Sequence, residues 1–329
     1  MATTPVAALA RDELLERRRR LETALTAVAD PEPLRQLLHE VDETLDRIEQ
    51  GTFGLCSVCH EPIEADRLAA DPLLRNCLPH LNPAEQRALE RDLDLSSRVQ
   101  SALLPARELR HGEWEVIYHY EPFGAVSGDY CDVLASADGQ MHVLVGDVAG
   151  KGVAASLLMA YLHATFRSLV PLGLGVSEMV ERANHLFCES TGGRSDYATL
   201  ACVRASRQGE VEILNAGHCP PLHLSATSVA KVPPSGLPLG IFCSSPYSTT
   251  STTLASGDTL LLYTDGLSEA RDRSEQEFGE ERLVCAAQCR QGAPLLELVQ
   301  GCLDELATFR DGVACHDDLT LLALRRVAG

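Results

Sequence analysis

The order of apolar segments from residue 112 to the end of the chain most constrains the fold. Short apolar stretches with the length of β-strands come in consecutive sets, separated by hairpin-like breaks such as SRQGE and ASGD. They are WEVIYHY, MHVLVGD, YATLACVRA, EVEILNAG, SVAKVP, DTLLLYTDG and, at the end, DDLTLLALRRV. Helical patterns come in pairs, over 153–170 with 176–190 and over 280–291 with 294–309. This order predicts an α+β fold, with antiparallel sheets layered against helices, and not a repeating βαβ unit.

Composition excludes several classes of protein. With 329 residues, 45% of them apolar, the chain can form two or more domains with sizeable cores. A formal net charge of −19 argues against nucleic-acid binding, which needs a basic face. The N-terminus lacks the apolar core of a signal peptide, and the most apolar stretch, GVAASLLMAYLHATF, is better explained as a buried helix than as a membrane span. We therefore expect a cytoplasmic protein, whose twelve cysteines are thiols and metal ligands.

Residues 1–50 have the pattern of a helical hairpin. Leu34, Leu38, Val41, Leu45 and Ile48 follow the alternating four- and three-residue spacing of a coiled-coil seam. A compatible stripe precedes it at Leu14, Leu21, Leu25 and Val28. ADPEP, residues 29–33, separates the two, and the arginines at 17–20 fit a solvated face. We expect two short antiparallel helices.

Residues 51–81 have the pattern of a small zinc finger. Cys56 and Cys59 form one C-x2-C pair, and Cys77 with His80 forms a second knuckle after seventeen intervening residues. This spacing is typical of a structural tetrahedral Zn²⁺ site, and so short a segment needs such a metal to fold. The sequence GTFGLC, with Ile63, Arg67 and Leu68 after it, resembles the DksA/TraR zinc-finger region. Members of that family act on RNA polymerase, but here the short hairpin favours a scaffold or sensor module. His80 replaces the usual fourth cysteine.

Residues 82–105 predict an amphipathic linker helix that begins at Asn-Pro and ends at a proline. Leu89, Leu93, Val99 and Leu103 form its apolar stripe. The stripe is compatible with a homodimer seam or with packing on the chain's own domain, and the sequence does not decide between these two alternatives. The remaining residues, 106–329, form the largest predicted domain.

GDVAGKG, residues 146–152, lacks the spacing and the hydroxyl of a nucleotide-binding P-loop. It places Asp147 at a strand end instead, and three similar acids follow other strands: Asp129 in SGDYCD, Asp265 in YTDG, and Asp317 or Asp318 in CHDDLT. Each alone is compatible with an ordinary turn. Four such acids, with no histidine or cysteine pattern beside them, predict a shared site for Mg²⁺ or Mn²⁺. Two such ions can activate a water for attack on phosphorus.

These motifs, in order, identify a resemblance to the SpoIIE/RsbU-type phosphatases of the metal-dependent protein phosphatase 2C superfamily. The resemblance covers about residues 96–326 and includes SSRVQSALLP, NAGHCPPLHL, SGLPLGIF and FGEERL. It implies an αββα sandwich with two Mn²⁺ or Mg²⁺ ions that dephosphorylates phosphoserine or phosphothreonine on a protein. The expected metal ligands are Asp129, Asp147, Asp265 and Asp317, with the Val148 carbonyl. Asp317 is preferred because the family ligates through the first acid of the pair.

Other residues near the motifs have simpler explanations. Lys151 fits a helix-start lysine better than a phosphate ligand, and His218 in NAGH fits a hydrogen-bonded turn better than a catalytic base. Cys131 fits ordinary packing. The family's eukaryotic general-acid histidine has no counterpart here, so no residue is assigned to protonate the leaving oxygen.

The sequence thus predicts a protein serine/threonine phosphatase regulated by its N-terminal zinc module. By resemblance, the substrate is a phosphoprotein such as an anti-sigma-factor antagonist. The alternative is an RNA-polymerase-associated transcription regulator with an inactive phosphatase-like scaffold. The complete acid set favours the enzyme, because inactive relatives lose ligands.

Overall fold

The computed structural model describes residues 5–25, 31–64, 67–68, 71–136, 138–191 and 196–327. Contacts divide the chain into two compact units, Met1–Asp92 and Leu93–Gly329. Helix α4 (Pro83–Leu103) contributes residues to both.

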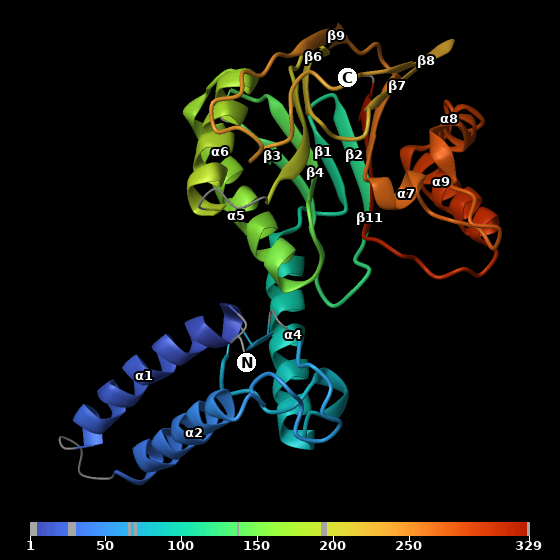
Figure 1. The fold of residues 1–329 in the computed structure, drawn as a ribbon. Helices are drawn as coiled ribbons and strands as arrows, with labels where there is room; N and C mark the ends of the chain where they lie inside the picture. The colour runs from blue at the N-terminus through green and yellow to red at the C-terminus, as the bar shows by residue number, and fades with distance from the viewer. Residues whose placement is uncertain are drawn as a thin grey trace. The chain divides into compact units, whose positions relative to one another are not determined.

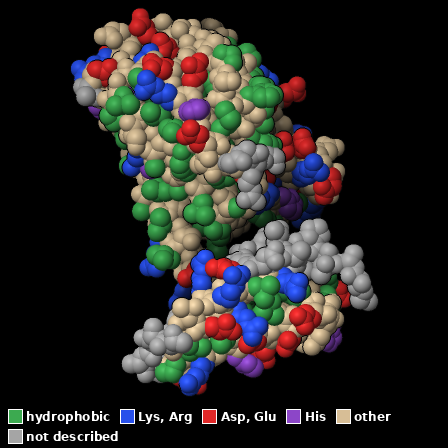
Figure 2. Space-filling model, turned by 60° about the vertical axis from the view of Figure 1, so that its left-hand side comes forward, with side chains coloured by type: hydrophobic (Ala, Val, Ile, Leu, Met, Phe, Trp, Pro, Cys, Tyr) green, Lys and Arg blue, Asp and Glu red, His purple; other side chains and the backbone are tan. Residues whose placement is uncertain are grey.

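The first unit contains a pair of antiparallel helices, α1 (Pro5–Leu25) and α2 (Glu32–Glu49) (Figure 1). Their buried seam consists of Ala10, Leu14, Leu21, Val41, Leu45 and Ile48. Arg18 crosses between the helices to Asp42, with Nε 3.1 Å from Oδ1. Cationic and acidic side chains are interspersed on the face of this unit in the lower part of Figure 2, which fits the solvated face expected for residues 17–20. Val28 and Asp30 lie outside the described residues.

The rest of the first unit has little regular structure. A 3-10 turn, η1 (Leu78–His80), follows Cys77. A small core forms from Cys56, Ile63, Leu68 and Cys77. So small an apolar core contributes little stability by itself.

The second unit contains two antiparallel sheets (Figure 1). One has the strand order β1-β2-β11-β10-β7-β8, and the other has the order β3-β4-β5-β6-β9. The strands of the six-stranded sheet are β1 (Glu108–His111), β2 (Trp114–Glu121), β7 (Leu222–Ser225), β8 (Ser228–Lys231), β10 (Thr259–Tyr263) and β11 (Leu319–Arg326). Those of the five-stranded sheet are β3 (Asp129–Ala135), β4 (Met141–Val148), β5 (Ala198–Ala205), β6 (Glu210–Ala216) and β9 (Thr250–Thr253).

Three apolar cores stack these elements into four layers. The core between the sheets contains Trp114 and the inward-facing valines of β4, Val143 and Val145. A second core joins the five-stranded sheet to α5 (Val153–Leu169), the 3-10 turn η2 (Val170–Leu172) and α6 (Val176–Thr191). A third joins the six-stranded sheet to α7 (Asp265–Ser268), α8 (Gly279–Gln288) and α9 (Leu295–Arg310). The predicted αββα sandwich is confirmed.

Sequence patterns missed four strands of the sandwich, including the seven-residue β3. Strands β1, β7 and β9 have four residues each, which is too few for a two-residue alternation to stand out. Asp265 follows the end of β10 by two residues, as expected, and it also begins the single turn of α7, which was not predicted.

Among the described residues, one helix, over Val153–Leu172, is long and apolar enough to cross a membrane by length and composition, although half of that window is buried. The buried side chains Met159, Leu162 and Phe166 pack against the five-stranded sheet. This position agrees with the buried helix expected from the sequence.

Candidate active site

Two of the predicted acids face each other across neighbouring strands. Asp129 begins β3 and Asp147 lies near the end of β4, and the antiparallel register makes the two residues direct partners. After Asp147 the backbone turns into α5 through Gly150 and Gly152, with φ of +106° and +76°. Such left-handed conformations favour glycine, which explains the second and third glycines of GDVAGKG.

Asp129 is buried and held by hydroxyl groups. Its side chain is 1% exposed, and Oδ2 accepts hydrogen bonds from Thr264 Oγ1 at 2.9 Å and Thr320 Oγ1 at 2.5 Å. The two threonines are themselves joined, because the Thr320 amide donates to Thr264 Oγ1. Thr264, which follows β10, and Thr320 of β11 therefore fix the orientation of a carboxylate that β3 supplies.

Asp265 and Asp317 lie at the rim of the same region, with Lys151. Lys151 Nζ is 2.9 Å from Asp317 Oδ2 and donates to the His316 carbonyl at 2.8 Å. It also lies 5.3 Å from the centre of the Phe123 ring. Lys151 is thus a cation of the site and not only a helix-start lysine, which the sequence had favoured.

Asp318 organises the surrounding backbone. Its two carboxylate oxygens accept hydrogen bonds from the Phe123 amide at 2.7 Å and the Gly128 amide at 2.8 Å. A Cβ on Gly266 would overlap the Asp318 carbonyl oxygen, so this position requires glycine. Backbone amides use both oxygens of Asp318, so this residue orients the site. The Asp317 side chain is 44% exposed, and its oxygens contact Lys151 Nζ and the Asp318 amide. This arrangement agrees with the preference for Asp317 as the ligand.

The acids perturb one another electrostatically. Burial and the charges of Asp265, Asp317 and Asp318 raise the pKa of Asp147 to about 7. Burial also raises the pKa of Asp129 well above its usual range, and Asp147 adds to that shift. Burial and the charge of Asp317 raise the pKa of Asp265. Mutually repelling carboxylates held in place by threonines and backbone amides are a suitable donor set for hard divalent cations.

A cleft of about 420 Å³ opens beside this acidic region. Its walls come from α7, the loop after it and the segment before β11, and they include Asp265 and Asp317. Lys151, Arg271 and Arg310 also line it, with Glu269 and Glu275 opposing their charge. The cleft can accommodate a substrate group next to the acids.

Two other candidates have structural roles. His218 is 4% exposed, Nδ1 lies 2.8 Å from Thr199 Oγ1, and its amide bonds to Asn215 Oδ1. Burial lowers the pKa of His218 to about 4, so it stays neutral and supports the strand end. Cys131 is buried in the core between the sheets, as ordinary packing predicts.

The groups that hold Asp129 were not predicted from the sequence. Thr264 directly precedes Asp265 in YTDG, and Thr320 lies two residues after Asp318 in DDLT. The sequence indicated a role for these two threonines only through their positions inside two of the motifs. Gln100 and Ser127, which bond to each other near Asp129, likewise lie inside motifs, SSRVQSALLP and SGDYCD, but their pairing was not predicted.

In the first unit, the structure brings Cys56, Cys59, Cys77 and His80 together. One ligand atom from each lies within 4.8 Å of the other three. Cys59 Sγ is 3.7 Å from Cys77 Sγ, and Cys77 Sγ is 3.2 Å from His80 Nδ1. Tetrahedral Zn²⁺ with Zn–S bonds of about 2.3 Å needs S···S edges of about 3.8 Å, so the cluster fits this ion.

Local hydrogen bonds also favour a thiolate at Cys56. Burial opposes ionisation, but amide hydrogen bonds from Cys59, Cys77 and Val58, with one from the Cys77 thiol, lower the pKa of Cys56 to about 6. Since the thiolate is the form that ligates metal, this knuckle is prepared for a cation.

Comparisons with known proteins agree with the site's geometry. The family model described as "Stage II sporulation protein E (SpoIIE)" matches residues 137–327. Protein IcfG of Synechocystis sp. is 25% identical over 269 residues, which cover 71% of this chain and 41% of that protein. Phosphoserine phosphatase RsbU of Bacillus subtilis is 25% identical over 251 residues, covering 73% of this chain and 72% of that protein. The chain therefore spans less than half of IcfG.

Solved structures show the same fold. The RsbU and RsbW domains of Rv1364c from Mycobacterium tuberculosis superpose with a TM-score of 0.58 at 30% identity, covering 68% of this chain and 62% of that one. The SiaA-PP2C domain of Pseudomonas aeruginosa gives a TM-score of 0.65 at 23% identity, covering 74% of this chain and 99% of that one. The resemblance inferred from the motifs is confirmed: the chain belongs to the SpoIIE family, and its fold is that of PP2C domain structures.

Proposed function

We propose that this chain is a metal-dependent protein serine/threonine phosphatase. The observation that carries the proposal is the convergence of Asp129, Asp147, Asp265 and Asp317 beside an open cleft, where burial and neighbouring carboxylates raise the pKa of the first three. The name of its relative RsbU, a phosphoserine phosphatase, supports the same activity.

In this proposal the four carboxylates and the Val148 carbonyl hold two Mn²⁺ or Mg²⁺ ions. Such ions, when bound, supply an activated water and neutralise phosphoryl charge. The chain's own groups position the carboxylates: Thr264 and Thr320 orient Asp129, and Asp318 fixes the neighbouring loop. The Lys151 side chain is 55% exposed, and in this proposal its Nζ contacts a phosphate oxygen at the rim. No residue is assigned to protonate the leaving oxygen.

The finer assignments are part of the proposal. The substrate is a phosphorylated regulatory protein, of which an anti-sigma-factor antagonist is the candidate, and the compartment is the cytoplasm. Cys56, Cys59, Cys77 and His80 bind one structural Zn²⁺ in a module that regulates the phosphatase. The division into 1–50, 51–81, 82–105 and 106–329 stays a prediction, as does a homodimer through the linker helix.

The test is Mn²⁺-dependent hydrolysis of an aryl phosphate and of a phosphoserine peptide by the full chain. Asp147→Ala should abolish a chelator-sensitive activity that the wild type has. Asp304→Ala, which removes an exposed acid on α9, is the matched control and should retain it. If the wild type and residues 93–329 alone were both inactive with Mn²⁺ and Mg²⁺, the phosphatase proposal would fail. That result would favour the RNA-polymerase-associated scaffold.

A further inference from the structure

Gln100 is the one residue of α4 that is buried, at 7% exposure, and it is polar. Its side-chain amide donates a hydrogen bond to the backbone of Ser127 and accepts another from it. Gln100 Nε2 donates to the Ser127 carbonyl at 2.7 Å, and the Ser127 amide donates to Gln100 Oε1 at 2.9 Å. A buried side chain that satisfies both backbone groups of a loop residue fixes the position of that loop.

The loop fixed by Gln100 leads directly to a proposed metal ligand. Ser127 Oγ accepts a hydrogen bond from the Asp129 amide at 3.0 Å. The intervening Gly128 amide donates to Asp318. One short segment, 127–129, is therefore held by α4 on one side and by the segment before β11 on the other.

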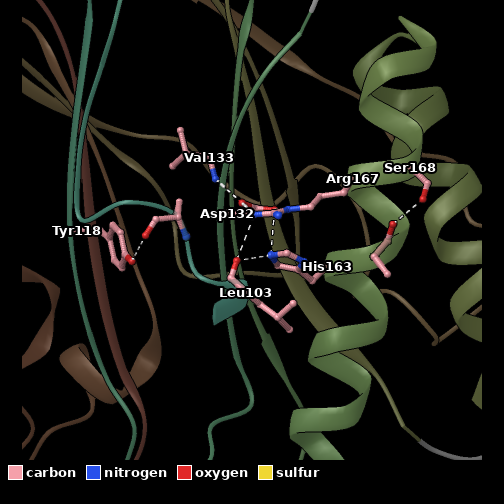
Figure 3. Close-up of polar contacts among 9 residues, drawn as sticks. Leu103, Tyr118, Asp132, Val133, His163, Arg167 and Ser168 are labelled. Atoms are coloured by element: carbon pink, nitrogen blue, oxygen red, sulfur yellow. Dashed lines mark hydrogen bonds and ion pairs between the residues drawn. The ribbon is translucent and has the colours of Figure 1, made fainter. Parts of the chain in front are cut away.

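A second network of hydrogen bonds links Leu103, the last residue of α4, to strand β3 (Figure 3). The Leu103 carbonyl oxygen lies 2.6 Å from His163 Nε2 and 3.2 Å from Arg167 Nη2, both on α5. Arg167 also binds the fully buried Asp132 of β3, with Nε 3.0 Å from Oδ2 and Nη2 3.2 Å from Oδ1. The final turn of α4 thus contacts the polypeptide just before Asp129 and is linked through α5 to the strand just after it.

We propose that Gln100 is a positioning residue for the metal site, and that docking of the last turn of α4 sets the geometry of Asp129. The inference rests on the proposed function for its consequence, because a displaced Asp129 weakens metal binding and hence hydrolysis. A carboxylate with little exposure cannot reach a metal by rotating alone, so its backbone position matters. Because α4 begins in the first unit and ends in the second, its docking provides a covalent route by which the zinc module regulates the phosphatase.

The experiment compares Mn²⁺ affinity of the full chain, measured by calorimetry, with the Mn²⁺ dependence of aryl phosphate hydrolysis. Gln100→Ala should raise the Mn²⁺ dissociation constant by about tenfold or more, the range found for partners of metal ligands. Its kcat at saturating Mn²⁺ should stay within about twofold of the wild type, because no group that touches the substrate is removed. Gln86→Ala, an exposed glutamine of the same helix, should change neither quantity.

Ser127→Ala is the second variant, and it removes only the hydroxyl that accepts from the Asp129 amide. It should shift Mn²⁺ affinity in the same direction, and the double variant should lose less than the sum of the two effects because both act through one segment. If Gln100→Ala fails to fold, the shift in Ser127→Ala alone decides. Wild-type Mn²⁺ affinity in folded Gln100→Ala, or strict additivity, would overturn the proposal, and so would absence of Mn²⁺ binding by the wild type. Mn²⁺ binding without hydrolysis by the wild type would instead refute only the phosphatase function.

Discussion

Neutralising Asp147 should stabilise the metal-free protein while it abolishes hydrolysis. Burial and neighbouring acids raise the pKa of Asp147 from 3.8 to about 7. At 1.36 kcal/mol per pKa unit, full ionisation of this residue costs the folded state about 4 kcal/mol. Asp147→Asn removes this cost and keeps the side chain's size, so the variant should unfold with a free energy up to about 4 kcal/mol higher at pH 8.

The same shift sets the pH dependence of the metal-free protein. The unfolded chain loses the Asp147 proton above pH 3.8, whereas the folded protein retains it until about pH 7. The unfolded state therefore binds fewer protons in this window, and stability falls as the pH rises through it. Between pH 6 and pH 8 the loss from Asp147 should be about 1.4 kcal/mol. Mn²⁺ should reverse this trend, because the ion competes with the proton for the same oxygens.

The assay uses the single tryptophan of the chain, Trp114, which is 1% exposed in the core between the sheets. Its fluorescence reports unfolding of the second unit, and urea denaturation at pH 6 and pH 8 without Mn²⁺ gives the two free energies. Glu305→Gln, an exposed acid on α9, is the matched control and should keep the wild-type slope. An Asp147→Asn variant with the same pH slope as the wild type would refute the reasoning.

Three further predictions concern the zinc cluster, a close backbone contact and a buried ion pair. Cys59→Ser should reduce the zinc content, measured by elemental analysis, from about one ion per chain. Replacing the exposed Cys285 in Cys285→Ser should leave the zinc content unchanged. Unchanged zinc content in both variants would contradict the zinc site. Gly266→Ala should abolish hydrolysis, because the added Cβ would overlap the Asp318 carbonyl oxygen. Gly175→Ala, whose added Cβ would have nothing within 4 Å, should be active. Equal activities of the two variants would argue against so close an approach of Gly266 to Asp318. Arg167→Met should lower the free energy of unfolding by about 3 kcal/mol, because it leaves the buried Asp132 without its cationic partner. Adding Asp132→Asn to this variant should restore part of the loss. A double variant no more stable than Arg167→Met would show that uncompensated charge is not the cause.

Much of the active region could be predicted from the sequence because its residues lie at ends of apolar strands. A strand end is recognisable from local pattern, and a carboxylate placed there leaves the core. Asp129, Asp147 and Asp265 can therefore be identified as candidates without knowledge of any contact, whereas the choice of Asp317 over Asp318 came from the family resemblance. The cysteine spacing indicates the second cluster in the same way. The α+β class with antiparallel sheets also followed from local periodicity, since strands and helices have different repeats, whereas the αββα order came from the family resemblance.

The partners of those acids could not be predicted, because each comes from a distant part of the chain. Thr264 and Thr320 reach Asp129 across more than one hundred residues of sequence, and Asp318 reaches Gly128 across 190. The contacts of Lys151 could not be predicted either, because its sequence neighbours suggest a helix start and its spatial neighbour is Asp317. Gln100 looks like any polar residue of an amphipathic helix until the fold buries it against Ser127.

The sequence by itself therefore determined which residues are candidates for the chemistry, because hydrophobic period and motif spacing are properties of neighbouring positions. Only the tertiary structure decided how those residues are held and how strongly their charges interact. Pairing of β3 with β4, and packing of the two sheets, bring like charges together and exclude water from them. Both effects depend on distance and burial in three dimensions, which local patterns do not encode.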